Sequence, residues 1–355
     1  MALHAVIPAG GAGTRLWPMS RRSRPKHVLA LSRGGRSLLR ETYERIAPLA
    51  DQVHVLTEAR QMPLVKRLVP ELGREAFIVE PAARGTTSAL GLAALTLLAR
   101  DPDAVMLSVA ADHVVRGARA FGTAIRRAVA AAGATDCLVT IGLRPRFAAT
   151  GYGYVRVGER TGPGRAALFR VAEFVEKPDA ARAAEYLAAG TYYWNLSMFC
   201  WRAAAFVMEL DRHSPQHLRG LRRVLEARSR GDEGEALRLY SRLPAQAVDY
   251  TVMERTGNLL LVAADFGWND VGSWAELHEI WDRDRAGNVV EGDAVLLDTR
   301  DCLLSAPGKL VAAIGLRDLI VIETDDAILI CPRSRAQDVK RIVADLERSG
   351  RIRYL

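Results

Sequence analysis

Two patterns of apolar and polar positions alternate along the first 150 residues, and they predict strands and helices in turn. Short apolar runs bounded by polar or glycine positions predict strands at His4–Ala9, Val53–Thr57, Ala76–Val79, Ala104–Val109 and Cys137–Ile141. Longer stretches rich in alanine and leucine, Thr87–Arg100 and Ala118–Ala132, predict helices. Strands and helices in this order predict a doubly wound α/β domain around a mixed, mostly parallel sheet. Ligands of such sheets bind beyond the carboxyl ends of the strands, so the loops after Ala9, Val79 and Val109 should converge on one site.

The pattern changes after Asn288. Short β-branched runs at Ala294–Leu297, Leu310–Ile314, Leu319–Ile322 and Ala327–Ile330 are separated by turn residues and predict a small β appendage. A closing amphipathic helix is expected at Ser334–Arg348. The sequence therefore predicts two domains, residues 1–286 and residues 287–355.

A glycine-rich segment follows the first predicted strand. Gly10, Gly11 and Gly13 let the backbone N–H groups approach an anion, while Arg15 and Lys26 supply two cations. Glycines with two cations favour a triphosphate over a single phosphate. Neither the P-loop pattern nor the dinucleotide fingerprint is present, which argues against a nicotinamide oxidoreductase. The alternative is a turn that only links a strand to a helix.

Composition narrows the function classes. The chain has 355 residues, is 49% hydrophobic and carries a formal charge of +8, but its basic residues are scattered and aromatic residues are sparse. This predicts no nucleic-acid partner, and the absence of a long apolar run predicts no membrane span. Four widely spaced cysteines in apolar surroundings predict buried, reduced thiols and a cytoplasmic protein.

Two aspartates are candidate ligands for a hard cation. Asp112 lies just after the predicted strand Ala104–Val109, separated from it by two alanines, and Asp270 lies between glycines and tryptophans just before a predicted helix. For Asp270 taken alone, capping of that helix is the more common role, although Ser273 is also a candidate cap. His213 and His217 form a weaker metal candidate, because Pro215 interrupts them and no second ligand cluster is nearby.

Further polar side chains stand among apolar and aromatic residues. Glu176, Asn195 and Asp249 offer carboxylate and amide groups that suit sugar hydroxyls, and Lys177 could neutralise a phosphate on the same ligand. Glu176 and Lys177 could equally form a surface ion pair of little energetic value. Gly151 and its neighbours could equally form a turn before a strand.

Taken together, these motifs closely resemble those of the sugar-1-phosphate nucleotidylyltransferases, almost from end to end. The resemblance rests on the glycine-rich segment to Lys26, Glu80–Arg84, Asp112-His113, Gly142–Tyr154, Phe174–Pro178, Trp194-Asn195, Asp249–Glu254 and Phe266–Trp274. Three of its segments, Leu16–Pro18, Glu80–Arg84 and Phe266–Trp274, point to the guanylyl branch that uses mannose 1-phosphate.

The resemblance implies a nucleotidyltransferase, Rossmann-like fold with a β-helix-like appendage, and an enzyme that uses GTP and mannose 1-phosphate. It implies Arg15, Lys26, Asp112 and Asp270 as catalytic residues, with Asp112 and Asp270 holding Mg²⁺. It also implies nucleotide contacts at Gly10, Gly11, Gly13, Thr14, Glu80 and Ser88, and substrate contacts at Gly151, Glu176, Lys177, Asn195 and Asp249. A homodimer is expected, because the appendage of similar enzymes often mediates self-association.

The chain departs from the family pattern at two places. Gly85 stands where the family usually has asparagine, and Ser197 stands where it usually has a glycine that permits close approach. Two other functions stay open: a sister enzyme for another sugar 1-phosphate or nucleotide, and a subunit that senses nucleotide sugars without catalysis.

Overall fold

The computed structural model describes residues 1–11, 13–32, 34–161 and 168–355, so that Ala12 of the glycine-rich segment lies outside the described part. The described chain folds into two compact units, neither of which is one continuous segment. Unit 1 comprises residues 1–10, 42–111 and 115–267, and unit 2 comprises residues 11–41, 112–114 and 268–355.

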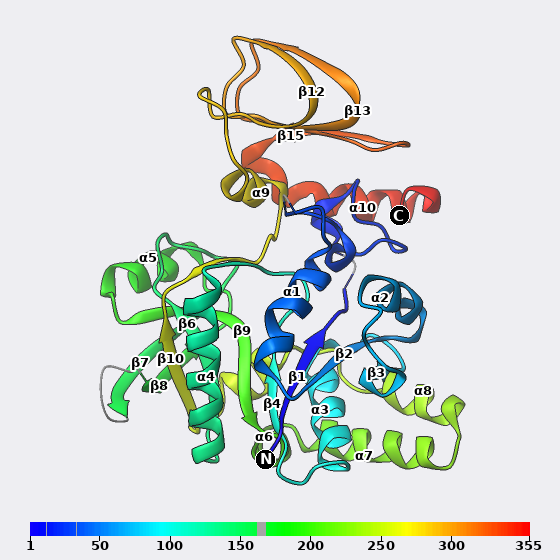
Figure 1. The fold of residues 1–355 in the computed structure, drawn as a ribbon, viewed down its shortest axis with the longest axis vertical. Helices are drawn as coiled ribbons and strands as arrows, with labels where there is room; N and C mark the ends of the chain where they lie inside the picture. The colour runs from blue at the N-terminus through cyan, green and yellow to red at the C-terminus, as the bar shows by residue number, and fades with distance from the viewer. Residues whose placement is uncertain (12, 33, 162–167) are drawn as a thin grey trace. The chain divides into compact units, whose positions relative to one another are not determined.

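Unit 1 is built on a mixed nine-stranded sheet with the strand order β3-β2-β1-β4-β9-β6-β10-β8-β7 (Figure 1). Its strands are β1 Leu3–Pro8, β2 Gln52–Glu58, β3 Phe77–Glu80, β4 Val105–Ser108, β6 Leu138–Leu143, β7 Gly153–Thr161, β8 Leu168–Val175, β9 Tyr192–Arg202 and β10 Leu259–Ala264. The strands β3, β2, β1 and β4 are parallel, as their apolar runs predicted. The strand β9 runs antiparallel to both β4 and β6, and it joins the parallel part to the rest of the sheet.

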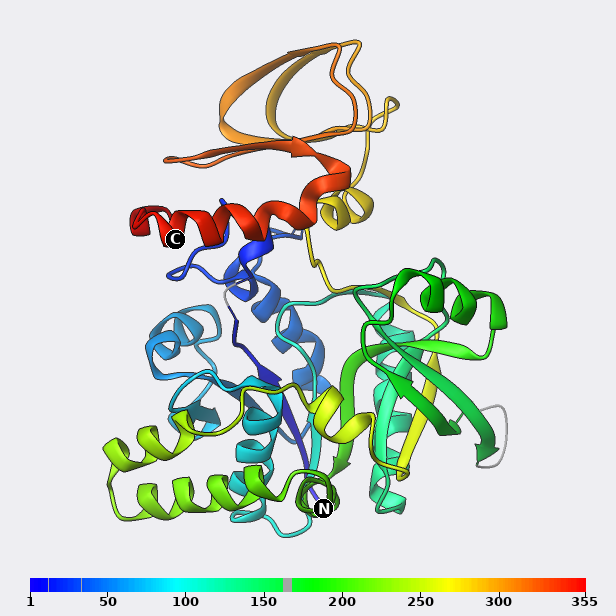
Figure 2. The same ribbon diagram turned by 180° about the vertical axis from the view of Figure 1, so that it is seen from behind.

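Helices cover both faces of this sheet. The helix α4 packs on one face, while α3, α6 and α7 pack together on the other, as Figures 1 and 2 show from opposite sides. The helices are α1 Leu38–Ile46, α2 Met62–Leu68, α3 Gly85–Leu98, α4 Ala118–Ala134, α5 Ala180–Ala189, α6 Ala203–His213, α7 Pro215–Ser229 and α8 Glu233–Ser241. A π-helix, Asp249–Met253, follows α8.

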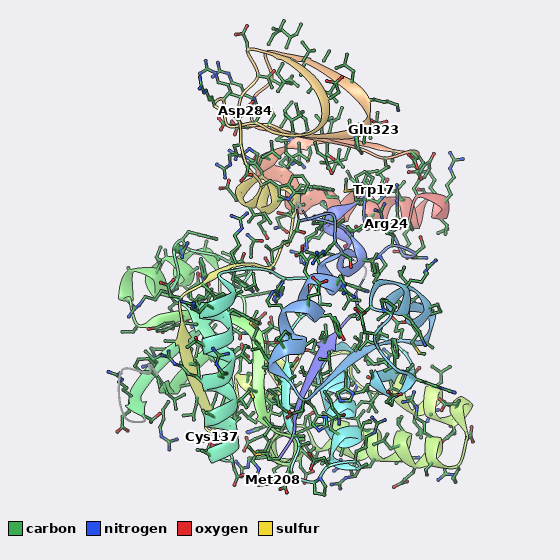
Figure 3. The ribbon with its side chains drawn as sticks, in the orientation of Figure 1. Trp17, Arg24, Cys137, Met208, Asp284 and Glu323 are labelled. Atoms are coloured by element: carbon green, nitrogen blue, oxygen red, sulfur yellow. The ribbon has the colours of Figure 1, made fainter. Side chains whose placement is uncertain are left out.

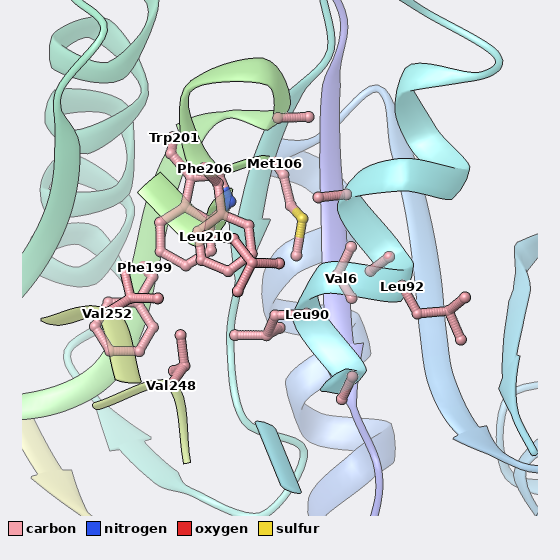
Figure 4. Close-up of a cluster of buried hydrophobic side chains, with 14 of the residues drawn as sticks. Val6, Leu90, Leu92, Met106, Phe199, Trp201, Phe206, Leu210, Val248 and Val252 are labelled. Carbon is pink, nitrogen blue, oxygen red and sulfur yellow. The ribbon is translucent and has the colours of Figure 1, made fainter. Parts of the chain in front are cut away.

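The core of unit 1 lies between the sheet and the helices α3, α6 and α7. Val6 and Met106 come from central strands, Leu90 and Leu92 from α3, and Phe206 from α6 (Figure 4). The rings of Trp201 and Phe206 stack with their centroids 4.3 Å apart. Each such side chain stabilises the fold by about 1.5–3 kcal/mol through the apolar surface it removes from water, which makes this sheet a rigid base for the loops at its edge.

Unit 2 combines the glycine-rich segment with the C-terminal appendage. Its sheet has the order β12-β13-β14-β15, and the pairs β12/β13 and β13/β14 are parallel. The elements are β12 Val289–Leu297, β13 Leu303–Ile314, β14 Leu319–Glu323, β15 Ile328–Pro332, α9 Trp274–Ile280 and α10 Val339–Arg348. Two short strands, β5 Val114–Arg116 and β11 Gly267–Asn269, pair with each other, and of these only residues 114, 268 and 269 belong to unit 2. The predicted closing helix proved shorter, because residues 333–338 form a 3₁₀ turn before α10 begins.

The apolar core of unit 2 connects the two ends of the chain. Leu16 and Trp17 are buried with Trp274, Val339 and Leu346. The indole of Trp17, labelled in Figure 3, donates from Nε1 to the carbonyl oxygen of Tyr354 at 2.8 Å. The glycine-rich segment is therefore held against the last helix of the chain.

Two predictions from composition can be compared with the structure. All four cysteines are unpaired, but only Cys200 and Cys302 are buried, while Cys137 and Cys331 are half-buried. None of the helices in the described ranges has both the length and the apolar content needed to cross a bilayer.

Candidate active site

The glycine-rich segment of unit 2 presents an exposed guanidinium on a short, well-anchored turn. Gly13 has φ +62°, a conformation that glycine adopts without steric cost, and residues 14–16 then form one 3₁₀ turn. Thr14 and Arg15 on this turn are exposed, whereas the next residue, Leu16, is fully buried. Burial of one side chain thus fixes the turn that carries the two polar ones.

Lys26 lies directly beneath Gly13. A Cβ added at Gly13 would come within 2.4 Å of the Lys26 Cβ, so that only glycine leaves room for this approach. The Lys26 side chain is 11% exposed. Its Nζ contacts the Asp112 Oδ2 at 2.7 Å and also donates to the main-chain carbonyl oxygen of Asp270. The structure therefore brings Lys26, Asp112 and Asp270 together within unit 2.

Asp112 is ionised in this environment. Burial raises its pKa, but the positive charge of Lys26 and the neighbouring His113 outweigh burial and hold the pKa below the usual range. The imidazole of His113 packs edge-on against Trp268, with ring centroids 5.3 Å apart. The segment that carries Asp112 is thus fixed on both sides by its neighbours in unit 2.

Asp270 stands in a strained loop and does not cap the following helix. Val271 has φ +50°, which is rare for a β-branched residue, and its N–H donates to the Asn269 Oδ1 at 2.6 Å. The N-terminal boundary residue of α9 is Ser273, the other cap candidate, so Asp270 does not take the alternative role of helix cap. Ser273 itself occupies the cap position, but its hydroxyl accepts no N–H of the helix and instead donates to the Glu276 Oε1 at 3.4 Å.

One oxygen of Asp270 is available to a ligand. Its Oδ1 is buried and has no hydrogen-bond partner among the described residues. Glu276, in the first turn of α9, lies beside Asp270, and its side chain accepts a hydrogen bond from the Gly272 N–H. Burial and the charge of Asp270 raise the pKa of Glu276 to about 8. A bound cation would lower the pKa of Glu276, because it would offset the negative charge of Asp270.

The oxygen donors around Lys26 suit Mg²⁺, which is commonly bound by one or two carboxylates together with substrate phosphates and water. Asp112 offers an ionised carboxylate and Asp270 an unpartnered buried oxygen. In the described part of the chain, no cluster of three or more His, Cys, Asp and Glu side chains could hold a metal alone. Phosphate oxygens and water would therefore have to complete the coordination shell.

His213 and His217 have structural partners instead. His213 contacts Glu209 at 3.2 Å, and the fully buried His217 contacts the Ser214 hydroxyl at 2.7 Å and the carbonyl oxygen of Pro244 at 3.1 Å. These contacts account for both imidazoles without a metal.

In unit 1, the predicted sugar-binding residues form a second cluster. The Asn195 Nδ2 donates to the Asp249 Oδ1 at 3.0 Å, and the Thr140 hydroxyl donates to the Asn195 Oδ1 at 3.2 Å. Burial raises the pKa of Asp249 to about 7, and the negative charge of Glu176 adds to the shift. Asn195 and Asp249 are thus held in one orientation, as a hydrogen-bonding site for hydroxyl groups requires.

Glu176 and Lys177 lie at the edge of this cluster. Lys177 donates to Glu176 and has φ +50°, and the Glu176 side chain is 8% exposed while that of Lys177 is 54% exposed. A Cβ added at Gly153 would come within 2.4 Å of the Glu176 Oε2, so this glycine leaves room for the carboxylate. Gly151, two residues earlier, is exposed. Glu176 is therefore a buried group of the cluster, although its ion pair with Lys177 is open to water.

The predicted base-binding residues lie near the start of α3. Glu80 ends β3, and its Oε2 accepts a hydrogen bond from the Tyr240 hydroxyl at 2.7 Å. Burial raises the pKa of Glu80 to about 7 despite this bond. Ser88 is fully buried, and its hydroxyl has no partner among the residues that the structure describes. Gly85 has φ +75°, and a Cβ there would come within 2.3 Å of the Gln246 carbonyl oxygen. This contact explains why the chain has glycine here, where the family usually has asparagine.

Three residues of these clusters were not predicted. Thr140 sits within an apolar stretch and Tyr240 within a helix of mixed leucine and arginine residues, and in neither place does a single hydroxyl give a distinct signal. Glu276 comes three residues after Ser273, and this spacing places two side chains on one helix face. The spacing could therefore have indicated that Glu276 lies near the loop that carries Asp270.

Comparison with known proteins agrees with this geometry. The nucleotidyl transferase family model matches residues 4–286, and the model described as a MannoseP isomerase/GMP-like beta-helix domain matches residues 292–346. A putative mannose-1-phosphate guanylyltransferase of Vibrio cholerae is 39% identical over 98% of this chain and 75% of its own length. The alginate biosynthesis protein AlgA of Pseudomonas aeruginosa is 39% identical over 98% of this chain and 72% of its own.

Solved structures show the same likeness. A protein described as mannose-1-phosphate geranyltransferase from Thermus thermophilus superposes with a TM-score of 0.87 and 34% identity, covering 98% of this chain and all of that one. A mannose-6-phosphate isomerase from Helicobacter pylori, at 21% identity and a TM-score of 0.62, shares the fold over 76% of this chain.

Proposed function

The chain belongs to the nucleotidyl transferase family, and from this premise we propose that it joins the GMP part of GTP to mannose 1-phosphate, releasing pyrophosphate and giving GDP-mannose. It is an enzyme that transfers a nucleotidyl group to a sugar phosphate, as its curated relatives named mannose-1-phosphate guanylyltransferase are.

The reaction is a direct displacement at the α-phosphorus of GTP. An oxygen of the sugar phosphate forms the new P–O bond, and the bond to the β-phosphate oxygen breaks with its electron pair leaving on pyrophosphate. The attacking phosphate is already an anion, so no general base is required. The protein has to overcome repulsion between two anions and keep them aligned.

Arg15 and Lys26 are proposed to neutralise the leaving pyrophosphate. A guanidinium forms two parallel hydrogen bonds with phosphate oxygens, whereas an ammonium supplies a compact point charge. The exposed position of Arg15 suits the first role, and the enclosed position of Lys26 under Gly13 suits the second.

Asp112 and Asp270 are proposed to hold Mg²⁺. When bound, this ion acts as a Lewis acid that lowers the cost of charge on the α-phosphate. In the structure, the ammonium of Lys26 lies against the Asp112 carboxylate and balances its charge.

The remaining roles follow the two clusters. Gly11, Gly13 and Thr14 of unit 2 would contact the triphosphate. Gly10, which ends the first segment of unit 1, would contact it as well. In unit 1, the Glu80 and Ser88 region would receive guanine, Gly151, Glu176, Asn195 and Asp249 would contact mannose, and Lys177 would lie near its phosphate. A carboxylate such as Glu80 can accept hydrogen bonds from the N–H groups of guanine.

One observation carries this proposal. A single ammonium, that of Lys26, contacts both the Asp112 carboxylate and the Asp270 main chain, although these residues lie far apart in the sequence.

The test is pyrophosphate release measured for GTP and for ATP, each paired with mannose 1-phosphate, glucose 1-phosphate and other sugar phosphates, with and without Mg²⁺. We expect the highest rate for GTP with mannose 1-phosphate and a requirement for the divalent ion. Asp270→Asn should lower turnover by at least about 100-fold, because metal stabilisation of the transition state amounts to several kcal/mol.

Asp265→Asn is the matched control, since its side chain is 96% exposed. Near-normal turnover of Asp270→Asn would refute the metal assignment. No pyrophosphate release from any pair would refute the function itself.

Three further features belong to the proposal. We propose a homodimer formed through the appendage, which carries exposed aliphatic side chains such as Leu297 and Ile314. The four unpaired thiols support a cytoplasmic setting. The division into two domains, with the boundary between residues 286 and 287, stays a prediction.

A further inference from the structure

The strand β9 contains a bulge beside the predicted sugar-binding cluster. Phe199 pairs with Thr140 of β6, and the next pair joins Asn195 to Gly142. Leu196, Ser197 and Met198 therefore oppose a single residue of β6. Bulges of this kind re-aim side chains, and they occur often next to active sites.

Ser197, the middle residue of the bulge, differs from all its neighbours. From Tyr192 to Trp201 it is the only exposed residue of β9. It has φ +51°, a conformation that costs a residue with a Cβ on the order of 1 kcal/mol or more. Its main-chain N–H donates to the Asn195 Oδ1 at 3.2 Å.

The bulge also lies at the edge of the sheet where ligands bind. Phe199 pairs with Ser108, the last residue of β4, so β9 carries Ser197 two residues beyond the carboxyl end of that strand. Ligands of doubly wound sheets occupy the crevice outside these ends. The hydroxyl of Ser197 is thus open to solvent at this edge, and its main chain is bonded to Asn195, which in turn contacts Asp249.

We propose that Ser197 is a specificity-determining residue of the sugar subsite, where its hydroxyl hydrogen-bonds a sugar hydroxyl and its Cβ narrows the space beside Asn195. The proposal rests on the function proposed above. The new element is a side chain that distinguishes one sugar 1-phosphate from its epimers. Ser197 stands at a position where the sugar-1-phosphate nucleotidylyltransferases usually have glycine.

Two substitutions separate the hydroxyl from the Cβ. Ser197→Ala removes only the hydroxyl, so the KM for mannose 1-phosphate should rise about 3- to 10-fold while kcat and the KM for GTP stay unchanged. Ser197→Gly also removes the Cβ, so the ratio of kcat/KM for mannose 1-phosphate to that for glucose 1-phosphate should fall at least about threefold.

The melting temperature checks the fold. Ser197→Gly should melt at or above the wild-type temperature, because glycine relieves the positive φ. Ser229→Ala, an exposed serine on α7, is the matched control and should change none of these quantities.

The outcomes distinguish this inference from the function on which it rests. If the wild type releases pyrophosphate but neither variant changes the KM or the sugar ratio, the inference is wrong and the function stands. Equal losses with every sugar phosphate and with GTP would show a purely structural role and would also overturn it. If the wild type is inactive with every pair, the proposed function fails first.

Discussion

At the scale of single residues, the site depends on how closely a backbone can approach a charged side chain. Lys26 is enclosed beneath Gly13, in contact with Asp112 and the main chain of Asp270. Val271 beside it accepts an unfavourable φ, which a buried aliphatic residue tolerates only where packing on all sides enforces it. The positions of these charges therefore follow from backbone geometry more than from the charges themselves.

Gly13→Ala tests this dependence. The new Cβ would meet the Lys26 Cβ at 2.4 Å at a φ of +62°, so we expect a loss of unfolding free energy on the order of 2–4 kcal/mol and at least a tenfold loss of activity as Lys26 moves. Gly35→Ala is the control, because Gly35 has a similar φ of +65° and a Cβ there would meet no atom of the described residues within 4 Å, its chain neighbours aside. Urea unfolding and pyrophosphate release measure both effects. Equal stability losses in the two variants, with activity kept in Gly13→Ala, would contradict the argument.

A second residue-scale prediction concerns pH. Burial raises the pKa of Glu80 to about 7, so the folded protein keeps a proton there that the unfolded chain releases near pH 4.5. The unfolded chain binds fewer protons between these values, and stability falls as the pH rises from about 4.5 to about 7. Glu80→Gln should remove this loss. Between pH 5 and pH 8 the unfolding free energy of the wild type should therefore fall by about 2 kcal/mol more than that of the variant.

Urea unfolding of both proteins at pH 5 and pH 8 gives this difference. Asp249, whose pKa is also raised to about 7, is present in both proteins and cancels from it. An identical pH dependence in the two proteins would show that Glu80 titrates normally.

At the scale of elements, the strands of the parallel half of the sheet could be predicted from the sequence, whereas β6 was the only other strand of this sheet that was predicted. The strands β1 to β4 and the helices α3 and α4 repeat an apolar period bounded by clear turn residues. The strand β9 combines aromatic core residues with Asn195 and an exposed serine in one run, so its pattern indicates a binding segment as readily as a strand. The helices α6 and α7 pack on α3, and α8 packs on α7, and only these tertiary contacts show their place in the fold.

The residues of the candidate site also fall into a group that could be predicted from the sequence and a group that could not. Short, distinctive motifs predicted the catalytic candidates, whereas the partners that orient them were hidden in ordinary apolar sequence. Thr140 is one buried hydroxyl in a strand, yet it fixes the orientation of the Asn195 amide. Long-range pairs such as Tyr240 with Glu80 cannot be derived from local periodicity at all.

The helix α10 gives the element-scale prediction. Leu346, 7% exposed, packs in the core that buries Leu16 and Trp17, so Leu346→Ala should cost about 2–4 kcal/mol and raise the KM for GTP as the turn carrying Arg15 loosens. Ile342→Ala on the same helix, 40% exposed, should cost under about 1 kcal/mol and leave the KM unchanged. A stability loss in Leu346→Ala without any change in KM would show that α10 does not position the turn.

At the scale of the whole molecule, the appendage carries the feature that bears on self-association. Leu297 and Ile314 pair across β12 and β13, and they are 55% and 71% exposed. Two such side chains in contact with water favour a partner surface.

Ile314→Asp should convert the proposed homodimer into a single chain of 38.8 kDa. Light scattering after size-exclusion chromatography measures the mass. Met208→Asp, at a 61% exposed position on α6, should leave the mass unchanged. A wild type that already elutes as one chain, or a variant that keeps the wild-type mass, would refute a dimer through this face.

The packing of residues 11–41 with residues 268–355 also has a consequence for biosynthesis. The ribosome adds Leu16 and Trp17 long before Val339 and Leu346, with which they share an apolar core. A nascent chain therefore exposes these apolar groups until α10 has been made, and a message cut short before α10 yields a product in which the turn that carries Arg15 lacks this core.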